Sequence, residues 1–204
     1  PLIVTHGEDL VTSTPMRGAQ ILRLDESGQR ELVGMRWGYP AAKALGPGGP
    51  PKHIHARAET IDRLPTFAES FAMRRGILPV RTFNEGEELP NGKTKQWVVT
   101  PKDGEVIGIA VVWRDFEYES GTLTAFVQVT TDANALISKI TDRMPAILSF
   151  SQWPVWLGET DASLAEIKSL LVTFDDKGNW DMAEQEQPRG RQKPPPPKPE
   201  PGLF

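Results

Sequence analysis

The sequence predicts an α+β fold in which antiparallel β-strands dominate a single domain. Five segments are rich in β-branched and aromatic residues and are separated by turns that contain Gly or Asp, a pattern typical of strands. They are AQILRLD (19–25), ELVGMRW (31–37), KQWVVTP (95–101), VIGIAVVW (106–113) and LTAFVQVTT (123–131). The first two flank the turn ESGQR, which predicts a β-hairpin.

A few helices are expected to flank these strands. Three segments show helical periodicity: 59–75, 133–140 and 161–171. Pro65 interrupts the first of them, and Asp161 is the expected N-cap of the last. The segments 44–52 and 84–93 are rich in turn-forming residues and are expected to be loops. No internal repeat is present, so the elements fit one domain.

The composition is that of a globular protein, and it removes several kinds of chemistry. The 204 residues are 38% hydrophobic, hold no apolar run of membrane-spanning length and begin with no basic-then-apolar leader. We therefore expect a cytoplasmic protein without a membrane partner. The absence of cysteine excludes disulfides, thiolate zinc sites and thiol nucleophiles within these residues. The net charge of −4 argues against sequence-independent coating of nucleic acid but allows a small basic groove.

Residues 188–204, PRGRQKPPPPKPEPGLF, form a basic tail distinct from the domain that we assign to residues 1–187. Proline removes backbone donors and fixes φ, so a stiff polyproline-type arm is expected. The tail ends in Leu203 and Phe204, two bulky apolar residues after a polar tether. Two interpretations stay open: a disordered tail, or a peptide that docks in an apolar pocket of a partner.

The stretch KHIHARAETI carries alternating polar residues whose chemistry is unusual for a surface strand. On an extended chain, side chains two residues apart share a face, so His53, His55, Arg57 and Glu59 are expected to lie on one side. A His-x-His pair has the spacing of two metal ligands, but the sequence marks no third ligand, so no metal is expected. An exposed polar strand is the ordinary alternative. The small alanines on either side of Arg57 favour a place that a ligand approaches closely.

Three further segments combine polar and apolar residues, and each has an ordinary interpretation when taken alone. MRWGYP places Trp37 before a turn, where a tryptophan is usually part of the core. ILPVRTFNEGEE carries carboxylates after an apolar strand, as a solvated loop would. ITDRMPAILS places Asp142 and Arg143 after a predicted helix, as a terminal ion pair would. Their order along the chain is more informative than any one of them.

Taken in order, RWGYP, HARAET, ILPVRTFNE, VTT-AN and ITDRMPAIL resemble the SRAP (SOS response-associated peptidase) family over about residues 14–157. The resemblance implies a barrel-like, SRAP-type fold and a nucleoid-associated role in the response to DNA damage. Family members recognise abasic sites in single-stranded DNA and trap them as a DNA–protein crosslink. The α-amine and thiol of an N-terminal Cys condense with the sugar aldehyde to a thiazolidine, and the same site removes the initiator Met.

The resemblance carries three family residues onto this sequence unchanged. The active-site Glu falls on Glu85, although its surroundings differ from the family pattern, because PVRTFNEG replaces a segment like PADGFYEW. The two phosphate-binding arginines fall on Arg57 and Arg143. Trp37 and Thr130, in the RWGYP and VTT segments, are expected to contribute to nucleic-acid binding beside them.

Two positions of the resemblance depart from the family. His55 replaces an asparagine, and Thr141 replaces the histidine that moves protons in the family. Threonine does not titrate near neutral pH, so we hypothesise that the imidazole of His55 takes over this task. The alternative is that His55 only packs against the bound DNA backbone. The candidate catalytic residues are therefore Glu85, His55 and Thr141.

The family's nucleophilic Cys is absent from this sequence, and several explanations stay open. Either the native chain has a segment before Pro1 that carries the Cys, or the protein is a crosslinking-incompetent module that binds DNA. An iminium on the secondary amine of Pro1, and a peptidase acting on other proteins, are further alternatives. The expected partner is single-stranded DNA with abasic sites, bound by a monomer without a cofactor. The end of the tail, Leu203 and Phe204, partly resembles peptides that bind the bacterial sliding clamp.

Overall fold

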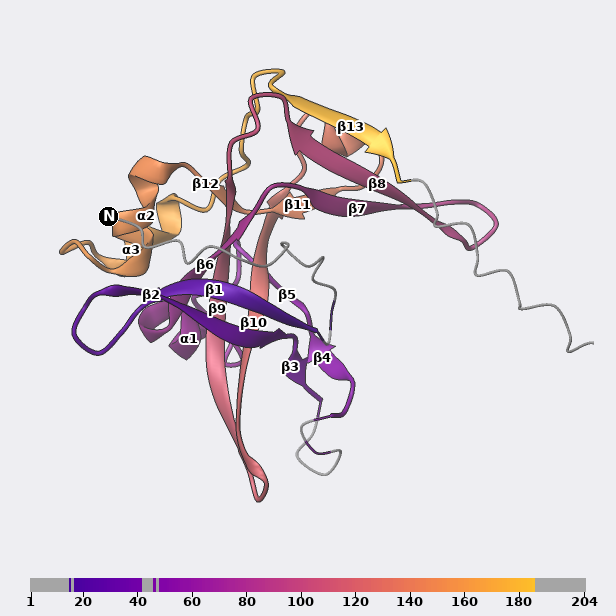
Figure 1. Cartoon of the computed structure of the whole chain (residues 1–204). Helices are drawn as coiled ribbons and strands as arrows, with labels where there is room; N and C mark the ends of the chain where they lie inside the picture. Colours follow the sequence, from indigo (N-terminus) through magenta and orange to yellow (C-terminus); the bar gives the residue numbers. More distant parts are fainter. Residues whose placement is uncertain (1–14, 16, 42–45, 47, 186–204) are drawn as a thin grey trace, which may run out of the picture.

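A computed structural model describes residue 15, residues 17–41, residue 46 and residues 48–185, and it consists mainly of β-strands around two apolar clusters (Figure 1). The largest sheet contains β1 (Gly18–Leu24), β2 (Arg30–Trp37), β5 (His55–Arg57), β6 (Arg75–Val80), β9 (Ile107–Tyr118), β10 (Gly121–Asp132), β11 (Arg143–Pro145) and β12 (Ile147–Leu148). A three-stranded sheet contains β7 (Phe83–Glu88), β8 (Thr94–Pro101) and β13 (Trp180–Glu184). The short strands β3 (Tyr39–Pro40) and β4 (Pro51–His53) pair with each other.

The large sheet curls into a barrel-like form that is not fully closed. Its strand order is β11-β10-β2-β1-β6-β9-β12, with an additional pairing of β10 with β9. Two of these strand pairings are short: β1 pairs with β6 only at Leu22 and Ile77, and β2 pairs with β10 at two positions. Most pairings are antiparallel, and β10 pairs in parallel with β2 and β5. The predicted α+β, mainly antiparallel, single-domain fold is confirmed.

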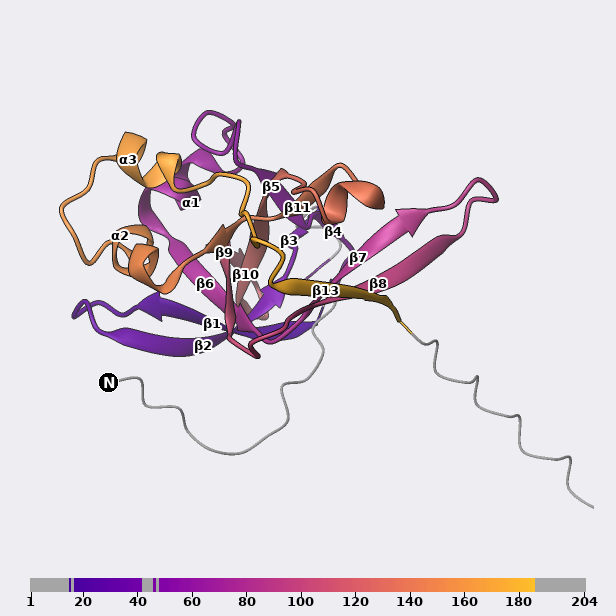
Figure 2. The same ribbon diagram turned by 90° about the horizontal axis from the view of Figure 1, so that it is seen from above.

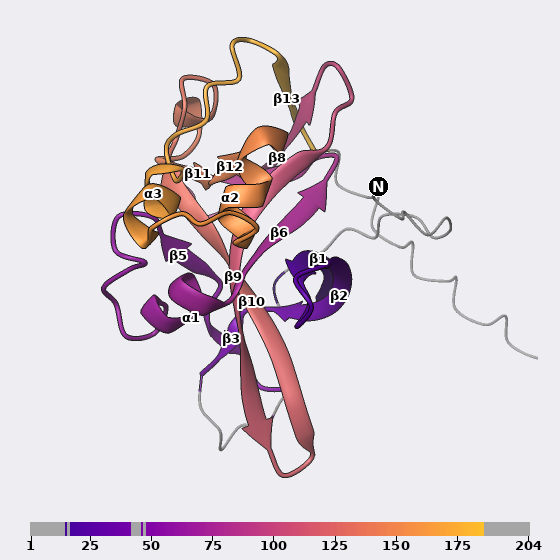
Figure 3. The same cartoon turned by 90° about the vertical axis from the view of Figure 1, so that its left-hand side faces the viewer.

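The long hairpin of β9 and β10 is the centre of the structure and extends beyond the rest of the sheet (Figure 3). Successive side chains of β10 point to opposite faces, so Val127 and Val129 enter one apolar cluster and Phe126 enters the other. Further along the Phe126 face, the side chains are polar: Gln128 and Thr130. The apolar cluster that contains Phe126 therefore ends at a polar border on β10, formed by Gln128 and Thr130.

The three-stranded sheet contributes to the apolar cluster that contains Phe126. Its strands β7 and β8 project away from the large sheet (Figure 2). Phe83 on β7 pairs with Val99 on β8, and both are buried in the cluster that contains Phe126. Two residues further along β7, Glu85 lies on the same face, where the apolar lining ends. The expected loop at 84–93 is wrong in its first half, because Asn84–Glu88 belongs to β7.

The helices are shorter than predicted. Their bounds are α1 (Ala68–Met73), α2 (Trp153–Leu157) and α3 (Leu164–Ser169), with 3₁₀ turns at η2 (Ile137–Lys139) and η3 (Phe150–Gln152). The N-cap of α3 is Ser163, not Asp161, because Ser163 and Glu166 form a reciprocal capping box. The predicted helix 133–140 is only η2. The side-chain oxygen of Asn134 accepts hydrogen bonds from the backbone N–H groups of Leu136 and Ile137, as an N-cap does, but the turn ends at Lys139.

None of the helices in the described part of the chain is long and apolar enough to cross a membrane. The tail, its boundary at residue 188 and the apolar residues Leu203 and Phe204 lie outside the described residues. Pro1 lies outside them as well.

Candidate functional site

A pocket of about 310 Å³ lies where the polar border of β10 meets β7. Its lining comes from β5, β10 and β11, from the segment before β11, and from β7: His55, Arg57, Glu85, Gln128, Thr130, Thr141, Asp142, Arg143, Met144 and Pro145. Six of the seven site residues expected from the sequence are therefore brought together, although they span almost 90 positions. The seventh, Trp37, does not line the pocket.

Strand β5 positions His55 and Arg57 by pairing in parallel with β10. Ala56 between them is buried in the apolar cluster on the far side, so the two polar side chains point into the pocket. The backbone N–H of Ala58 donates to the Thr130 carbonyl at 2.9 Å, which fixes the end of the strand. The side chain of Arg57 is exposed and makes no hydrogen bond or ion pair with any described residue. This guanidinium is available to a ligand.

Glu85 is a carboxyl group of the pocket whose ionisation is altered by its surroundings. Its side chain is partly buried at the end of the apolar face of β7, and no described side chain donates a hydrogen bond to it. Burial therefore raises the pKa of Glu85 to about 7. A carboxyl group with such a pKa can both give and accept a proton at neutral pH.

His55 is held close to an aromatic wall at the back of the pocket. The Trp37 ring lies 6.1 Å from the imidazole, and its indole N–H donates to the Ile54 carbonyl at 2.9 Å. Trp37 also stacks on Phe126, with ring centroids 6.1 Å apart. Although His55 retains an exposed surface, desolvation by these neighbours lowers its pKa, so the neutral imidazole is favoured at pH 7. Trp37 supports His55 and does not line the pocket.

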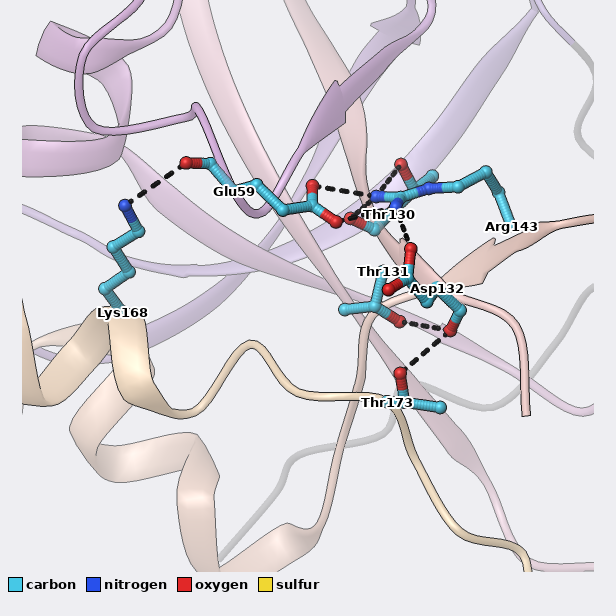
Figure 4. Close-up of polar contacts among 7 residues, drawn as sticks. All are labelled: Glu59, Thr130, Thr131, Asp132, Arg143, Lys168 and Thr173. Atoms are coloured by element: carbon cyan, nitrogen blue, oxygen red, sulfur yellow. Dashed lines mark hydrogen bonds and ion pairs between the residues drawn. The ribbon is translucent and has the colours of Figure 1, made fainter.

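Arg143 is bound tightly within the protein (Figure 4). Its Nη1 donates to Glu59 Oε1 and to Asp132 Oδ1, each at 2.6 Å. Its Nη2 donates to Glu59 Oε2 at 3.0 Å and to the Thr130 carbonyl at 2.8 Å. These carboxylates raise the pKa of the Arg143 guanidinium, and Arg143 holds the pKa of Glu59 below its usual range. The expected phosphate contact of Arg143 stays a prediction, and its charge is already matched inside the protein.

His53 does not join the other residues of its motif. The strand breaks at Ile54, and the ring of His53 packs edge-on against Phe67 at 5.4 Å, away from the pocket. The expectation of one shared polar face over residues 53–59 is therefore wrong at its first member. Among the residues that the structure describes, no group of three or more His, Cys, Asp or Glu side chains could hold a metal ion.

The pocket is not lined by a net positive charge, contrary to what the two family arginines suggest. Arg57 and Arg143 are accompanied by the carboxyl groups of Glu85 and Asp142. Asp142 and Gln128 were not among the expected site residues. Gln128 could have been found from the period-two pattern of LTAFVQVTT, because it shares a face with Thr130. Thr141 lines the pocket as expected, with a hydroxyl group that cannot titrate near pH 7.

Comparison with known proteins gives relatives along most of the chain. Residues 7–185 match the sequence profile of the family described as SOS response associated peptidase (SRAP). The abasic site processing protein YoaM of Bacillus subtilis is 30% identical over 159 residues, which cover 76% of this chain and 69% of that protein. The abasic site processing protein YoqW of the same species is 31% identical over 160 residues, which cover 76% and 70%.

Solved structures with the same arrangement of strands support this assignment. A protein from Bacteroides thetaiotaomicron superimposes with a TM-score of 0.69 at 25% identity, over 84% of this chain and 75% of that one. A protein from Bordetella bronchiseptica superimposes with a TM-score of 0.72 at 22% identity, over 85% and 86%, which shows the shared fold. From its sequence match, its curated relatives and its fold, the chain belongs to the SRAP family.

Proposed function

We propose that the protein binds abasic sites in single-stranded DNA and holds the baseless sugar in the pocket of Glu85 and Arg57. The observation that carries this proposal is the pairing, in one pocket, of a guanidinium without a hydrogen-bond or ion-pair partner among the described residues and a carboxyl group with a pKa of about 7. A phosphate oxygen satisfies the former, and a sugar hydroxyl exchanges protons with the latter. The names of the Bacillus relatives, which process abasic sites, agree with this chemistry.

The residues of the pocket are suited to opening the abasic sugar. In the closed sugar, C1′ carries a hydroxyl group and is bonded to the ring oxygen O4′. Neutral His55 accepts the C1′ hydroxyl proton while the protonated carboxyl of Glu85 donates a proton to O4′, so that the C1′–O4′ bond breaks. The products are an aldehyde at C1′ and a hydroxyl group at C4′, and no co-reactant is needed. The Thr141 hydroxyl can donate a hydrogen bond to the sugar but cannot shuttle protons by titrating.

The covalent step of the family requires a nucleophile that these 204 residues do not contain, because none of them is a cysteine. A Cys at the native N-terminus, ahead of Pro1, would supply an amine and a thiol, which add to the aldehyde carbon and release one water. In a chain that carries this Cys, we propose that the same pocket also removes the initiator Met. The full-length natural protein should then run on a denaturing gel as a complex with abasic DNA, without any added reductant.

Binding is tested with fluorescent single-stranded oligonucleotides that contain an abasic site, its tetrahydrofuran analogue, or an intact nucleotide. Fluorescence anisotropy should give tighter binding to the first two, and Arg57→Ala should weaken binding roughly fivefold or more, as expected for a charge-assisted contact. Arg63→Ala, which removes an exposed arginine outside the pocket, should bind as the wild type does. Equal affinity for the abasic and intact oligonucleotides would contradict the proposal.

A second candidate function is a DNA-binding module that recognises the damage without crosslinking. It is favoured by Thr141, which stands where the family has its proton-moving histidine. Such a module would bind the tetrahydrofuran analogue as tightly as the true abasic site, because it makes no use of the aldehyde. A crosslink formed by the full-length protein excludes this candidate.

Recruitment to the sliding clamp through Leu203 and Phe204, and a monomeric state, stay predictions, since the structure does not describe the tail. Deleting the last two residues should abolish capture by immobilised clamp while leaving the DNA affinity unchanged. Unchanged capture would refute this role for the tail. Light scattering at two protein concentrations tests whether the protein is a monomer.

A further inference from the structure

Gln128 places a carboxamide in the pocket, and the proposed function does not yet use it. The residue lies within β10, is 7% exposed and lines the pocket. Its neighbours Val127 and Val129 enter the apolar cluster on the opposite face, so the side chain of Gln128 points toward the pocket. Its backbone N–H donates to the Ile54 carbonyl at 3.2 Å, but its side chain makes no hydrogen bond with any described residue.

The lack of a partner is unusual for a buried amide. A carboxamide has two N–H donors and an oxygen with two lone pairs, and an amide that is buried without a partner destabilises the folded state. The other buried amide among the described residues, Asn134, is also 7% exposed, and both of its ends are bonded. Its oxygen accepts from two backbone N–H groups, and its nitrogen donates to the Phe174 carbonyl and to Asp176. Asn134 therefore has a structural role, whereas the carboxamide of Gln128 is open to a ligand.

His55 lies beside Gln128 and determines which ligand atom the carboxamide meets. The two residues are partners in the parallel pairing of β5 with β10, so their side chains lie side by side on the pocket face. In the proposed ring opening, neutral His55 accepts the proton of the C1′ hydroxyl group. That oxygen keeps lone pairs, which accept a hydrogen bond from a donor beside the imidazole. The Gln128 carboxamide supplies such a donor, and the bond is kept while the hydroxyl oxygen becomes the aldehyde oxygen.

We propose that Gln128 recognises the C1′ oxygen of the abasic sugar by donating a hydrogen bond from its carboxamide. This inference rests on the proposed function and adds to it the residue that reads the one group by which the closed abasic sugar differs from its tetrahydrofuran analogue. In an intact nucleotide C1′ carries a ring nitrogen of the base, which has no free lone pair to accept this bond. Gln128 thus selects the product of base loss by its chemistry, in addition to the fit of the bare sugar.

The contact is tested first by removing the oxygen from the ligand. Fluorescence anisotropy compares three single-stranded oligonucleotides, which contain a natural abasic site, a borohydride-reduced abasic site or the tetrahydrofuran analogue. The first two carry an oxygen at C1′ and the third does not. The reduced site cannot form a covalent adduct with an amine or a thiol, so its affinity reports non-covalent contacts alone. We expect the wild type to bind both oxygen-bearing strands roughly threefold to tenfold tighter than the analogue, as one neutral hydrogen bond gives.

The contact is tested next by removing the amide from the protein. Gln128→Met keeps the length of the side chain but has no N–H donor, so it should bind all three strands with the affinity that the wild type has for the analogue. Its salt slope, which is the slope of log affinity against log salt concentration, should equal that of the wild type, because the amide carries no charge. Gln20→Met, the same change at an exposed position of β1, is the matched control and should keep the full preference.

Several results would overturn the inference. They are equal affinity of the wild type for the reduced site and the analogue, a preference that survives in Gln128→Met, and a preference limited to the natural abasic site, which would come from an imine with a protein amine. A shallower salt slope for Gln128→Met would also overturn it, because the substitution would then disturb contacts to the DNA backbone. If the wild type prefers none of the three strands over an intact one, the proposed function itself fails, and this outcome is distinct from the others.

The stability of the ligand-free protein separates a binding role of Gln128 from a structural one. Because its amide has no partner, Gln128→Met and Gln128→Leu should melt at or above the wild-type temperature. Asn134→Leu, which removes the bonded amide, should melt several degrees lower. A melting temperature below that of the wild type in both Gln128 variants would mean that the folded protein itself uses the amide, and the assignment of Gln128 to the ligand would be wrong.

Discussion

The raised pKa of Glu85 predicts that this residue makes the protein less stable as the pH rises. In the unfolded chain a glutamate loses its proton near pH 4.5, whereas burial delays this in the folded state to about pH 7. Between these values the folded protein holds one proton more than the unfolded chain, so the free energy of unfolding falls as the pH rises. At about 1.4 kcal/mol for each pH unit, the full loss above pH 7 is about 3 kcal/mol.

Glu85→Gln removes this titration while keeping the shape of the protonated carboxyl group. We expect the variant to match the wild type near pH 4.5 and to be more stable at pH 8 by about 1–3 kcal/mol, since the open side of the pocket reduces the full effect. Urea unfolding at both pH values measures this, and the midpoint should differ by roughly 0.5–1.5 M at pH 8. Glu88→Gln, on the exposed face of the same strand, controls for the charge change. A difference between Glu85→Gln and the wild type that is independent of pH would show that Glu85 is hydrated, and the assignment of Glu85 as an acid would fall with it.

Three further changes test other parts of this structure. Trp97 lies directly opposite Glu85 in the β7–β8 pairing, so Trp97→Ala should admit water and lower the pKa of Glu85. NMR titration of the Glu85 carboxyl carbon measures this pKa. An unchanged pKa would mean that Trp97 does not shield Glu85 from water. The Arg75 guanidinium donates to three backbone carbonyls of α1 and α2 at 2.6–2.7 Å, so Arg75→Ala should cost about 3 kcal/mol in urea unfolding without changing the salt slope of DNA binding. A methyl group at Gly108 would lie 2.6 Å from Trp153 Nε1, so Gly108→Ala should lower the free energy of unfolding by about 1–3 kcal/mol. A melting temperature equal to that of the wild type would mean that the indole of Trp153 can move aside.

The sequence predicts the strands of this fold better than its helices, because the residue pattern is longer in the strands than in the helices. Strands such as β9 and β10 carry long runs of β-branched and aromatic residues, and the observed strands contain the predicted ones or nearly so. The helices have only five or six residues, so local contacts decide where they begin. β7 was missed because FNEGEE has few β-forming residues; its pairing with β8 across the turn creates the strand.

The sequence predicts which residues form the site, but it does not predict the protonation of Glu85 or the ion pairing of Arg143. The resemblance selects Glu85, Arg57 and Arg143 from distant segments, and the structure brings all three into one pocket. The pKa of Glu85 depends on its place at the end of an apolar face, which no local pattern reveals. The binding of Arg143 by Glu59 joins residues 84 positions apart, and a sequence shows only that both are charged.

Under the proposed function, recognition of DNA depends more on shape than on charge. With Arg143 neutralised by its two carboxylates, the pocket offers about one unmatched positive group, Arg57, to the DNA backbone. One contact gives a salt slope of about −0.7, far shallower than that of proteins which coat nucleic acid. The preference for a missing base must then come from the fit of a bare sugar into the pocket of about 310 Å³. A steric preference does not depend on salt, so plots for abasic and intact strands should run parallel. Lines that converge as salt increases would mean that the preference is electrostatic, and the pocket would lose its role in selecting the damaged nucleotide.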